Sequence, residues 1–170
     1  MTDVLVVSLG ATGGLRAADD ALVGALRRAG ATAELVRAEP VREWRTYALI
    51  ELAWARSARR AAQTGIEDHA PRALIYSSTT AALLWPRPGA IRFDAPAAGN
   101  RPGRHGIWQR PVERRRLAAS PLLLPWSEGG LAEAPPTSAP AVVVPVPVTS
   151  GGVSAERDRG AGAGGAERPA

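Results

Sequence analysis

A strand-length apolar run that opens into glycines constrains this chain most. Residues 4–9 read VLVVSL, and a glycine-rich turn over residues 10–14 follows directly. Apolar residues then recur at helical spacing up to Gly30, and the run TAELVRAE at 32–39 has the pattern of a second strand. Strand, glycine turn, helix and strand in this order form a βαβ unit. Its right-handed crossover predicts a parallel sheet that is buried on both faces.

The same alternation continues along the chain. We expect helices at about 41–63, 80–85, about 106–119 and 128–134, and strands within 72–78, 90–93, 121–127 and 140–148, the last as a sixth strand or an extended exit. The pattern predicts a Rossmann-like three-layer α/β/α sandwich with a mostly parallel sheet of about six strands, over residues 1–149. Residues 150–170 contain almost no large apolar side chain, so we expect a disordered Gly/Arg-rich tail.

The composition removes several mechanisms. All 21 basic residues are arginine, so the chain has no P-loop lysine, no Schiff-base lysine and no Tyr-x-x-x-Lys pair. There is no cysteine, and the two histidines are His69 and His105, so a zinc site made by the protein alone is not expected. No Gly-x-Ser-x-Gly motif occurs, and we set nucleophilic hydrolysis aside.

The glycine turn itself predicts a phosphate site. A strand that feeds a helix through glycines exposes backbone N–H groups at the helix N-terminus, where phosphate binds well. The spacing resembles Gly-x-x-Gly-x-x-Gly with Arg16 at the last position, and Glu39 at the end of the second strand is a carboxylate within range of a ribose. A tight turn without a ligand is the alternative.

Polar residues also gather where the later strands end. Ligands of open parallel sheets bind beyond the carboxyl ends of the strands, and hydroxyl and carboxylate groups suit sugar hydroxyls. These candidate residues are Ser78 and Thr79 after the third strand, Asp94 after the fourth, and Ser127 and Glu128 after the fifth. For each residue alone, capping of the following helix is the simpler interpretation.

A basic segment over residues 101–116 contains six arginines, with His105 and Trp108 among them. Arginines in this arrangement suit nucleotide phosphates or an anionic membrane surface, and a solvated helix face is the alternative. No nucleic-acid-binding motif accompanies them, so a nucleic-acid partner is not expected. His105 is a candidate general base.

The sequence also predicts a location. The N-terminus carries no signal-peptide pattern, and the apolar runs are too short to cross a bilayer. We therefore expect a cytoplasmic protein, with peripheral docking at the inner membrane face through the arginine segment as a further hypothesis.

These phrases resemble a known family when they are taken in order. Five stretches of the chain are similar, in this order, to the N-terminal domain of actinobacterial GT-B-type glycosyltransferases of the group 1, retaining kind. They are VLVVSLGATGGLRAADDALVGALRRAGATAELV, RALIYSSTTAALL, FDAPAAGNRPGRHG, SPLLLPWSEGGLAEAP and AVVVPVPV. The resemblance covers roughly residues 3–149. LLLPWSEGGLAEA resembles the strand, Ser-Glu and helix element of that family, and PVPV stands where its first domain ends.

The resemblance implies a hexosyltransferase-type enzyme that moves a sugar from a nucleotide-sugar to an acceptor, with no obligatory metal and no cofactor besides that co-substrate. It implies donor-phosphate contacts at Gly13 and Gly14, and it implies acceptor-side residues in the loop after the fourth strand. There Asp94 and His105 are the catalytic candidates and Asn100 is an acceptor-binding candidate, joined by the strand-end residues Ser78, Thr79, Ser127 and Glu128.

The second, donor-binding domain of that family has no counterpart here, and the Gly/Arg-rich tail stands in its place. We therefore expect little or no transfer by this chain alone, as in a truncated or frameshifted gene or a naturally short protein. Two alternatives stay open. One is an atypical NAD(P)-binding oxidoreductase that uses GATGG as its dinucleotide turn, and the other is a non-catalytic binding module or remnant.

Overall fold

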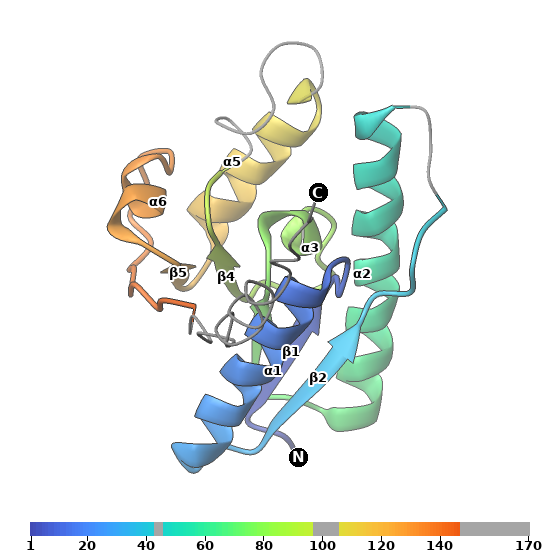
Figure 1. Cartoon of the computed structure of the whole chain (residues 1–170), viewed down its shortest axis with the longest axis vertical. Helices are drawn as coiled ribbons and strands as arrows, with labels where there is room; N and C mark the ends of the chain where they lie inside the picture. The colour runs from blue at the N-terminus through green and yellow to red at the C-terminus, as the bar shows by residue number, and fades with distance from the viewer. Residues whose placement is uncertain (43–45, 97–105, 147–170) are drawn as a thin grey trace, which may run out of the picture.

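The structure is a computed structural model that describes residues 1–42, 46–96 and 106–146 (Figure 1). Within these ranges, strands and helices alternate. The strands are β1 (Val4–Ser8), β2 (Ala33–Arg37), β3 (Ala73–Tyr76), β4 (Ala90–Phe93) and β5 (Leu123–Pro125). The helices are α1 (Gly13–Arg28), α2 (Tyr47–His69), α3 (Thr79–Ala82), α5 (Gln109–Ala119) and α6 (Glu128–Ala132).

The strands form one parallel sheet in the order β2-β1-β3-β4-β5. β1 pairs with β2 on one side and with β3 on the other, with Val4 opposite Ala33 and Ala73. The chain therefore changes direction across the sheet between β1 and β3. The carboxyl edge at such a switch point is where ligands of open α/β sheets bind.

The sheet has five strands in place of the predicted six. Beside β5, Ala141 forms an isolated parallel bridge with Leu123, and the N–H of Val142 donates to the Leu123 carbonyl at 2.9 Å. The next bridge would need an N–H from Pro125 of β5, and proline has none, so the regular ladder ends there although the N–H of Val144 donates to the Pro125 carbonyl at 2.9 Å. The α/β class and the parallel sheet are confirmed.

Helices cover both faces of the sheet, which gives three layers (Figure 1). Leu5 and Val7 of β1 point into a core that α2, α3 and α5 complete. Val6, between them, points to the opposite face and packs with Val23 of α1. This alternation is the period of a strand, and because both faces are covered the strand reads as a continuous apolar run.

Helix α2 differs from the helix predicted at about 41–63. It begins after Thr46, and it runs to His69, where Ala70 closes it in the left-handed conformation. Gly65, which follows the predicted end at about residue 63, lies inside α2. A Cβ on Gly65 would lie 2.9 Å from atoms of Leu5 and Val36, so this glycine allows α2 to approach the sheet closely.

Helix α5 begins at Gln109, three residues later than the predicted start at about 106. Pro111 lies in its first turn, where a missing N–H breaks no intrahelical hydrogen bond. Among the described residues, no helix combines the length and the apolar character that crossing a membrane requires.

Candidate functional site

Three of the helices that begin at the carboxyl edge of the sheet have an N-cap hydroxyl that accepts a backbone N–H of the first turn. The oxygen of Thr12 accepts the N–H of Leu15 at 3.2 Å at the start of α1. Ser78 and Ser127, predicted as acceptor-binding residues, make the corresponding bonds at α3 and α6, each at 3.1 Å. Capping is therefore their observed contact, and it holds both hydroxyls at this edge.

In the glycine turn between β1 and α1, both the N–H and the carbonyl of Gly10 form hydrogen bonds with side chains. This residue is in the left-handed conformation, with φ of 59°. Its N–H donates to Ser8 Oγ at 3.0 Å, and its carbonyl accepts a hydrogen bond from Arg16 Nη1 at 2.8 Å. Only glycine adopts this conformation without strain, so Gly10 has a local structural reason to be there.

Gly13 and Gly14 are the first two residues of α1, and both are exposed. The first N–H groups of a helix have no partner within the helix, and they carry the positive end of the helix dipole. A Cβ on Gly14 would meet nothing within 4 Å, so the backbone there is open to a ligand. The two glycines thus present free backbone donors, as predicted for a phosphate site.

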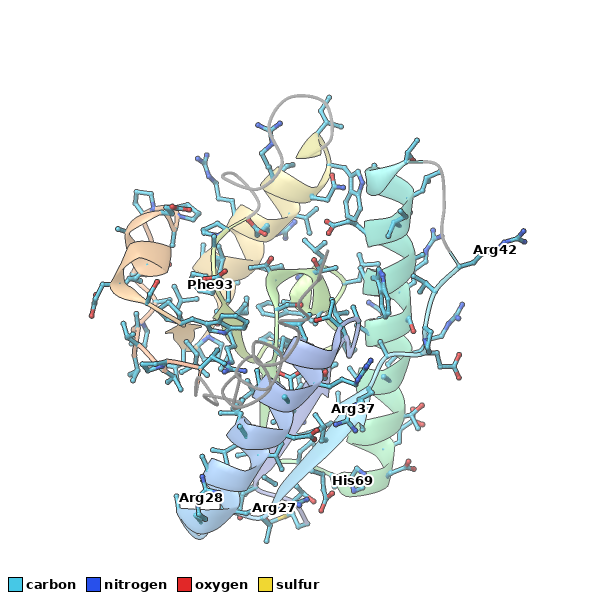
Figure 2. All side chains as sticks on the ribbon, viewed as in Figure 1. Arg27, Arg28, Arg37, Arg42, His69 and Phe93 are labelled. Carbon is cyan, nitrogen blue, oxygen red and sulfur yellow. The ribbon has the colours of Figure 1, made fainter. Side chains whose placement is uncertain are left out.

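Two arginines flank this turn. A Cβ on Gly10 would lie 3.4 Å from Cδ of Arg37 and 3.8 Å from Cγ of Arg16. Arg37 closes β2 and pairs with Asp20 of α1 at 2.6 Å, with 41% of its side chain exposed. Figure 2 shows Arg28 at the opposite end of α1, far from the turn. Two arginine side chains therefore lie near the start of α1, and Asp20 pairs with one of them.

A buried polar network that our sequence predictions missed lies beneath the turn. Arg92 of β4 places its Nη1 3.3 Å from Oδ1 of Asp19 in α1, and both side chains are 1% exposed. The same Nη1 lies 3.4 Å from the carbonyl oxygen of Ala18. On the other side, Ser8 Oγ donates to Asp19 Oδ2. The network joins β1, α1 and β4 under the candidate site.

Burial dominates the electrostatics of this pair. It raises the pKa of Asp19, against the hydrogen bonds from Ser8 and Ser77 and the charge of Arg92. It lowers the pKa of Arg92, against the charge of Asp19. The Arg92 guanidinium also stacks 5.1 Å from the centre of the Trp126 ring. The sequence signal was an arginine inside the apolar strand AIRF, which only a buried partner explains.

The remaining predicted residues divide into three groups. Asp94 follows β4 directly and is exposed, and Glu128 is the exposed first residue of α6. Thr79 is buried at the start of α3. Asn100 and His105 lie outside the residues that the structure describes. Parallel topology therefore places Asp94 and Glu128 on the same edge as Gly13 and Gly14, since all of them follow strand ends.

Glu39 is exposed beyond β2, beside a groove of about 470 Å³ between this strand end and α2. Arg37 and Arg60 line the same groove. A carboxylate and two guanidinium groups thus lie at the end of β2, where dinucleotide-binding folds recognise the adenosine ribose.

The described part of the arginine segment is only partly solvated. Arg110, Arg114 and Arg115 line a groove of about 580 Å³ between α5 and the residues around α6. Arg116 turns inward, with its guanidinium 4.9 Å from the Trp85 ring centre and its Nε donating to the Leu83 carbonyl at 3.0 Å. This arginine stabilises the packing of α5 on α3 and does not belong to a charged surface.

Within the described ranges, no three His, Cys, Asp or Glu side chains gather in a group that suits a metal ion. The chain matches no protein-family model, no curated protein and no solved structure. The interpretation of the site therefore depends on its geometry.

Proposed function

We propose that this chain is the acceptor-side, Rossmann-like domain of a GT-B-type retaining glycosyltransferase, and that its glycine turn faces the diphosphate of a nucleotide-sugar. One observation carries the proposal. The exposed N-terminal amides of α1, at Gly13 and Gly14, follow a turn at Gly10 against which the side chains of Arg16 and Arg37 lie, at the switch point of a parallel sheet.

This arrangement suits the chemistry of the leaving group. When a sugar departs from a nucleoside diphosphate, negative charge develops on the diphosphate oxygens. Backbone donors and guanidinium groups held in place before the reaction stabilise that charge without reorganising. The task of Gly13, Gly14 and the two arginines in this proposal is to bind the diphosphate and to stabilise its departure.

The acceptor side of the proposed site is the rest of the same edge. Asp94 and Glu128 supply carboxylates, and the capping hydroxyls of Ser78 and Ser127 retain lone pairs for sugar hydroxyl groups. Asp94 and His105 are the proposed proton-handling groups, while Asn100 and Thr79 complete the proposed acceptor contacts. A partner domain, also Rossmann-like, supplies the other donor contacts in this proposal.

NADPH is the strongest competing ligand. Arg37 ends β2, which is the position from which an arginine meets the 2′-phosphate of NADP in dinucleotide-binding folds. The groove beside it has room and a second arginine, Arg60. Against this alternative, the Arg16 side chain folds back onto the Gly10 carbonyl, at the point of the turn where a dinucleotide fold needs a small residue.

A membrane partner is a separate hypothesis about α5. Arg114 and Arg115 are exposed there, next to a largely apolar groove. If α5 docks on an anionic surface, sedimentation with liposomes will require anionic lipid and will weaken as salt is raised. Binding that is indifferent to salt or lipid charge contradicts this hypothesis and leaves the diphosphate proposal unaffected.

Amide NMR spectra recorded during titration with UDP and GDP test the main proposal. We expect the Gly13 and Gly14 signals to shift and saturate together, because their N–H groups contact the diphosphate. Gly30, at the other end of α1, is the internal control and should not move. Saturable binding that leaves Gly13 and Gly14 unperturbed would place the ligand elsewhere and refute the proposal.

A further inference from the structure

A continuous chain of polar contacts runs from the middle of the sheet to the glycine turn. Arg92 Nη1 lies 3.3 Å from Asp19 Oδ1, Asp19 Oδ2 accepts the hydroxyl hydrogen of Ser8, and Ser8 Oγ accepts the N–H of Gly10 at 3.0 Å. The Ser8 side chain, like those of Asp19 and Arg92, is almost wholly buried. Water therefore cannot easily replace any of these contacts.

The direction of each hydrogen bond in this chain is determined. An ionised carboxylate opposite a guanidinium only accepts, so the single hydrogen of the Ser8 hydroxyl must point to Asp19. The lone pairs of Ser8 are then left for the N–H of Gly10. If Asp19 lost its cationic partner and took up a proton, it could donate to Ser8, and the hydroxyl would be free to turn away from its present orientation.

Gly10 needs such an anchor. A glycine has access to conformations on both sides of φ = 0, and Gly10 is held at φ of 59°. The residues that follow it lead directly into Gly13 and Gly14, so the conformation of Gly10 sets the direction of those amides.

Buried ion pairs are often no more stabilising than apolar residues of the same size, so the pair of Asp19 and Arg92 is not explained by stability alone.

We infer that Arg92 is a positioning residue for the glycine turn, which acts through Asp19 and Ser8 without reaching the ligand. Its guanidinium keeps Asp19 ionised, Asp19 orients the Ser8 hydroxyl, and Ser8 holds Gly10. The effect on ligand affinity rests on the proposed function, whereas the effect on the turn does not.

Hydrogen exchange at the Gly10 amide tests this relay, the chain of contacts from Arg92 through Asp19 and Ser8 to Gly10, without any ligand. We expect Ser8→Ala and Arg92→Met each to speed this exchange about tenfold, the effect of losing roughly one hydrogen bond. The double variant should be no faster than the faster single one, because both changes break the same chain. Arg92→Lys, which keeps a cation opposite Asp19, should recover most of the protection.

Two matched controls separate the relay from a general loss of stability. Arg116→Met removes another arginine that stacks on a tryptophan, and Ser120→Ala removes another buried hydroxyl, which bonds to the Gly89 carbonyl at the opposite edge of the sheet. Neither should change exchange at Gly10. If Arg92→Met does not fold, Asp19→Asn/Arg92→Met, which leaves no unpaired buried charge, takes its place and should show the same fast exchange.

The inference would be overturned by unchanged exchange at Gly10 in folded Arg92→Met. Additive effects of Ser8→Ala and Arg92→Met in the variant that combines them would also overturn it. Calorimetric titration with UDP then tests the consequence for binding. We expect about tenfold weaker binding by Arg92→Met and wild-type affinity for both controls. Equal affinity in Arg92→Met and wild type refutes the link to the ligand. If wild type binds neither UDP nor GDP, the proposed function fails, and the exchange data alone decide the relay.

Discussion

Oδ1 of Asp19 and Nη1 of Arg92 lie 3.3 Å apart, and each side chain is 1% exposed. The pair joins the second turn of α1 to the middle of β4, across 73 residues of sequence. Two opposite charges that are buried together depend on each other, because either one alone would be left in a medium that cannot solvate it. We therefore expect changes to this contact to affect both the stability of the fold and the conformation of the glycine turn.

The first prediction concerns stability. Arg92→Met should lower the free energy of unfolding by about 3 kcal/mol or more, because it leaves Asp19 buried without a cation. Asp19→Asn/Arg92→Met should be clearly more stable than Arg92→Met alone, since no charge is orphaned. Urea denaturation measures both values. A double variant no more stable than Arg92→Met would show that lost packing, and not the unpaired charge, causes the loss.

The second prediction concerns pH. Burial raises the pKa of Asp19 above its ordinary value of 3.8, so the folded chain binds this proton more readily than the unfolded chain. The stability that protonated Asp19 contributes is fully present below 3.8 and is lost as pH rises through its folded pKa. The unfolding free energy of wild type minus that of Asp19→Asn should therefore fall as pH rises from about 4.

Asp3 provides a control of opposite sign. The side chain and backbone of Thr32 donate to its carboxylate and lower its pKa, so its stabilisation is present above 3.8 and is lost as pH falls through the folded value. The difference between wild type and Asp3→Asn should shrink at low pH. If the Asp19 difference also shrank toward low pH, the assigned direction of its pKa shift would be wrong.

The third prediction compares two adjacent glycines of α6. A Cβ on Gly130 would lie 2.0 Å from the carbonyl oxygen of Asp94, whereas a Cβ on Gly129 would meet Ser127 Oγ at an ordinary 3.7 Å. Gly130→Ala should therefore destabilise by about 1–3 kcal/mol or more, because backbone must shift. Gly129→Ala should be neutral or stabilise by up to about 1 kcal/mol. Thermal unfolding of the two variants measures this, and equal melting temperatures would contradict the close packing of α6 on the residue after β4.

The fourth prediction separates stability from binding at α1. Gly14→Ala should stabilise the helix by about 0.5–1 kcal/mol, since the new methyl group meets no atom of the protein. The same methyl group would occupy the space through which a diphosphate approaches the backbone, so UDP affinity should fall. Gly10→Ala should instead destabilise, because φ of 59° strains any residue with a Cβ. A more stable Gly14→Ala variant with full UDP affinity would exclude ligand contact at this position.

Much of the fold could be predicted because parallel strands buried on both faces appear as apolar runs. VLVVSL and AIRF stand out for this reason, and glycines mark the ends of α1. The end of α2 could not be predicted, because Gly65 suggests a break unless its contact with Leu5 is known. The predicted sixth strand did not form as a regular strand because Pro125 of the neighbouring β5 has no N–H to donate to it, although the segment itself is strongly apolar.

The candidate site was predictable only at its surface. Gly13, Gly14 and the strand-end hydroxyls follow from local pattern, since a residue after a parallel strand must lie at the carboxyl edge. The network beneath them depends on a pairing between Asp19 and Arg92 that no local pattern encodes. Asp20, the neighbour of Asp19, faces solvent and pairs with Arg37, so the sequence alone could not tell which aspartate is buried.

Equilibrium titration of the chain with UDP, GDP and NADPH, followed by tryptophan fluorescence, tests the central claim most directly. Trp126, one of the five tryptophans of the chain, lies against Arg92 of the network beneath the turn. The account predicts saturable binding of UDP or GDP that Arg16→Met and Arg37→Met weaken and Arg28→Met does not. Tight binding of NADPH with no response to either nucleoside diphosphate would contradict it.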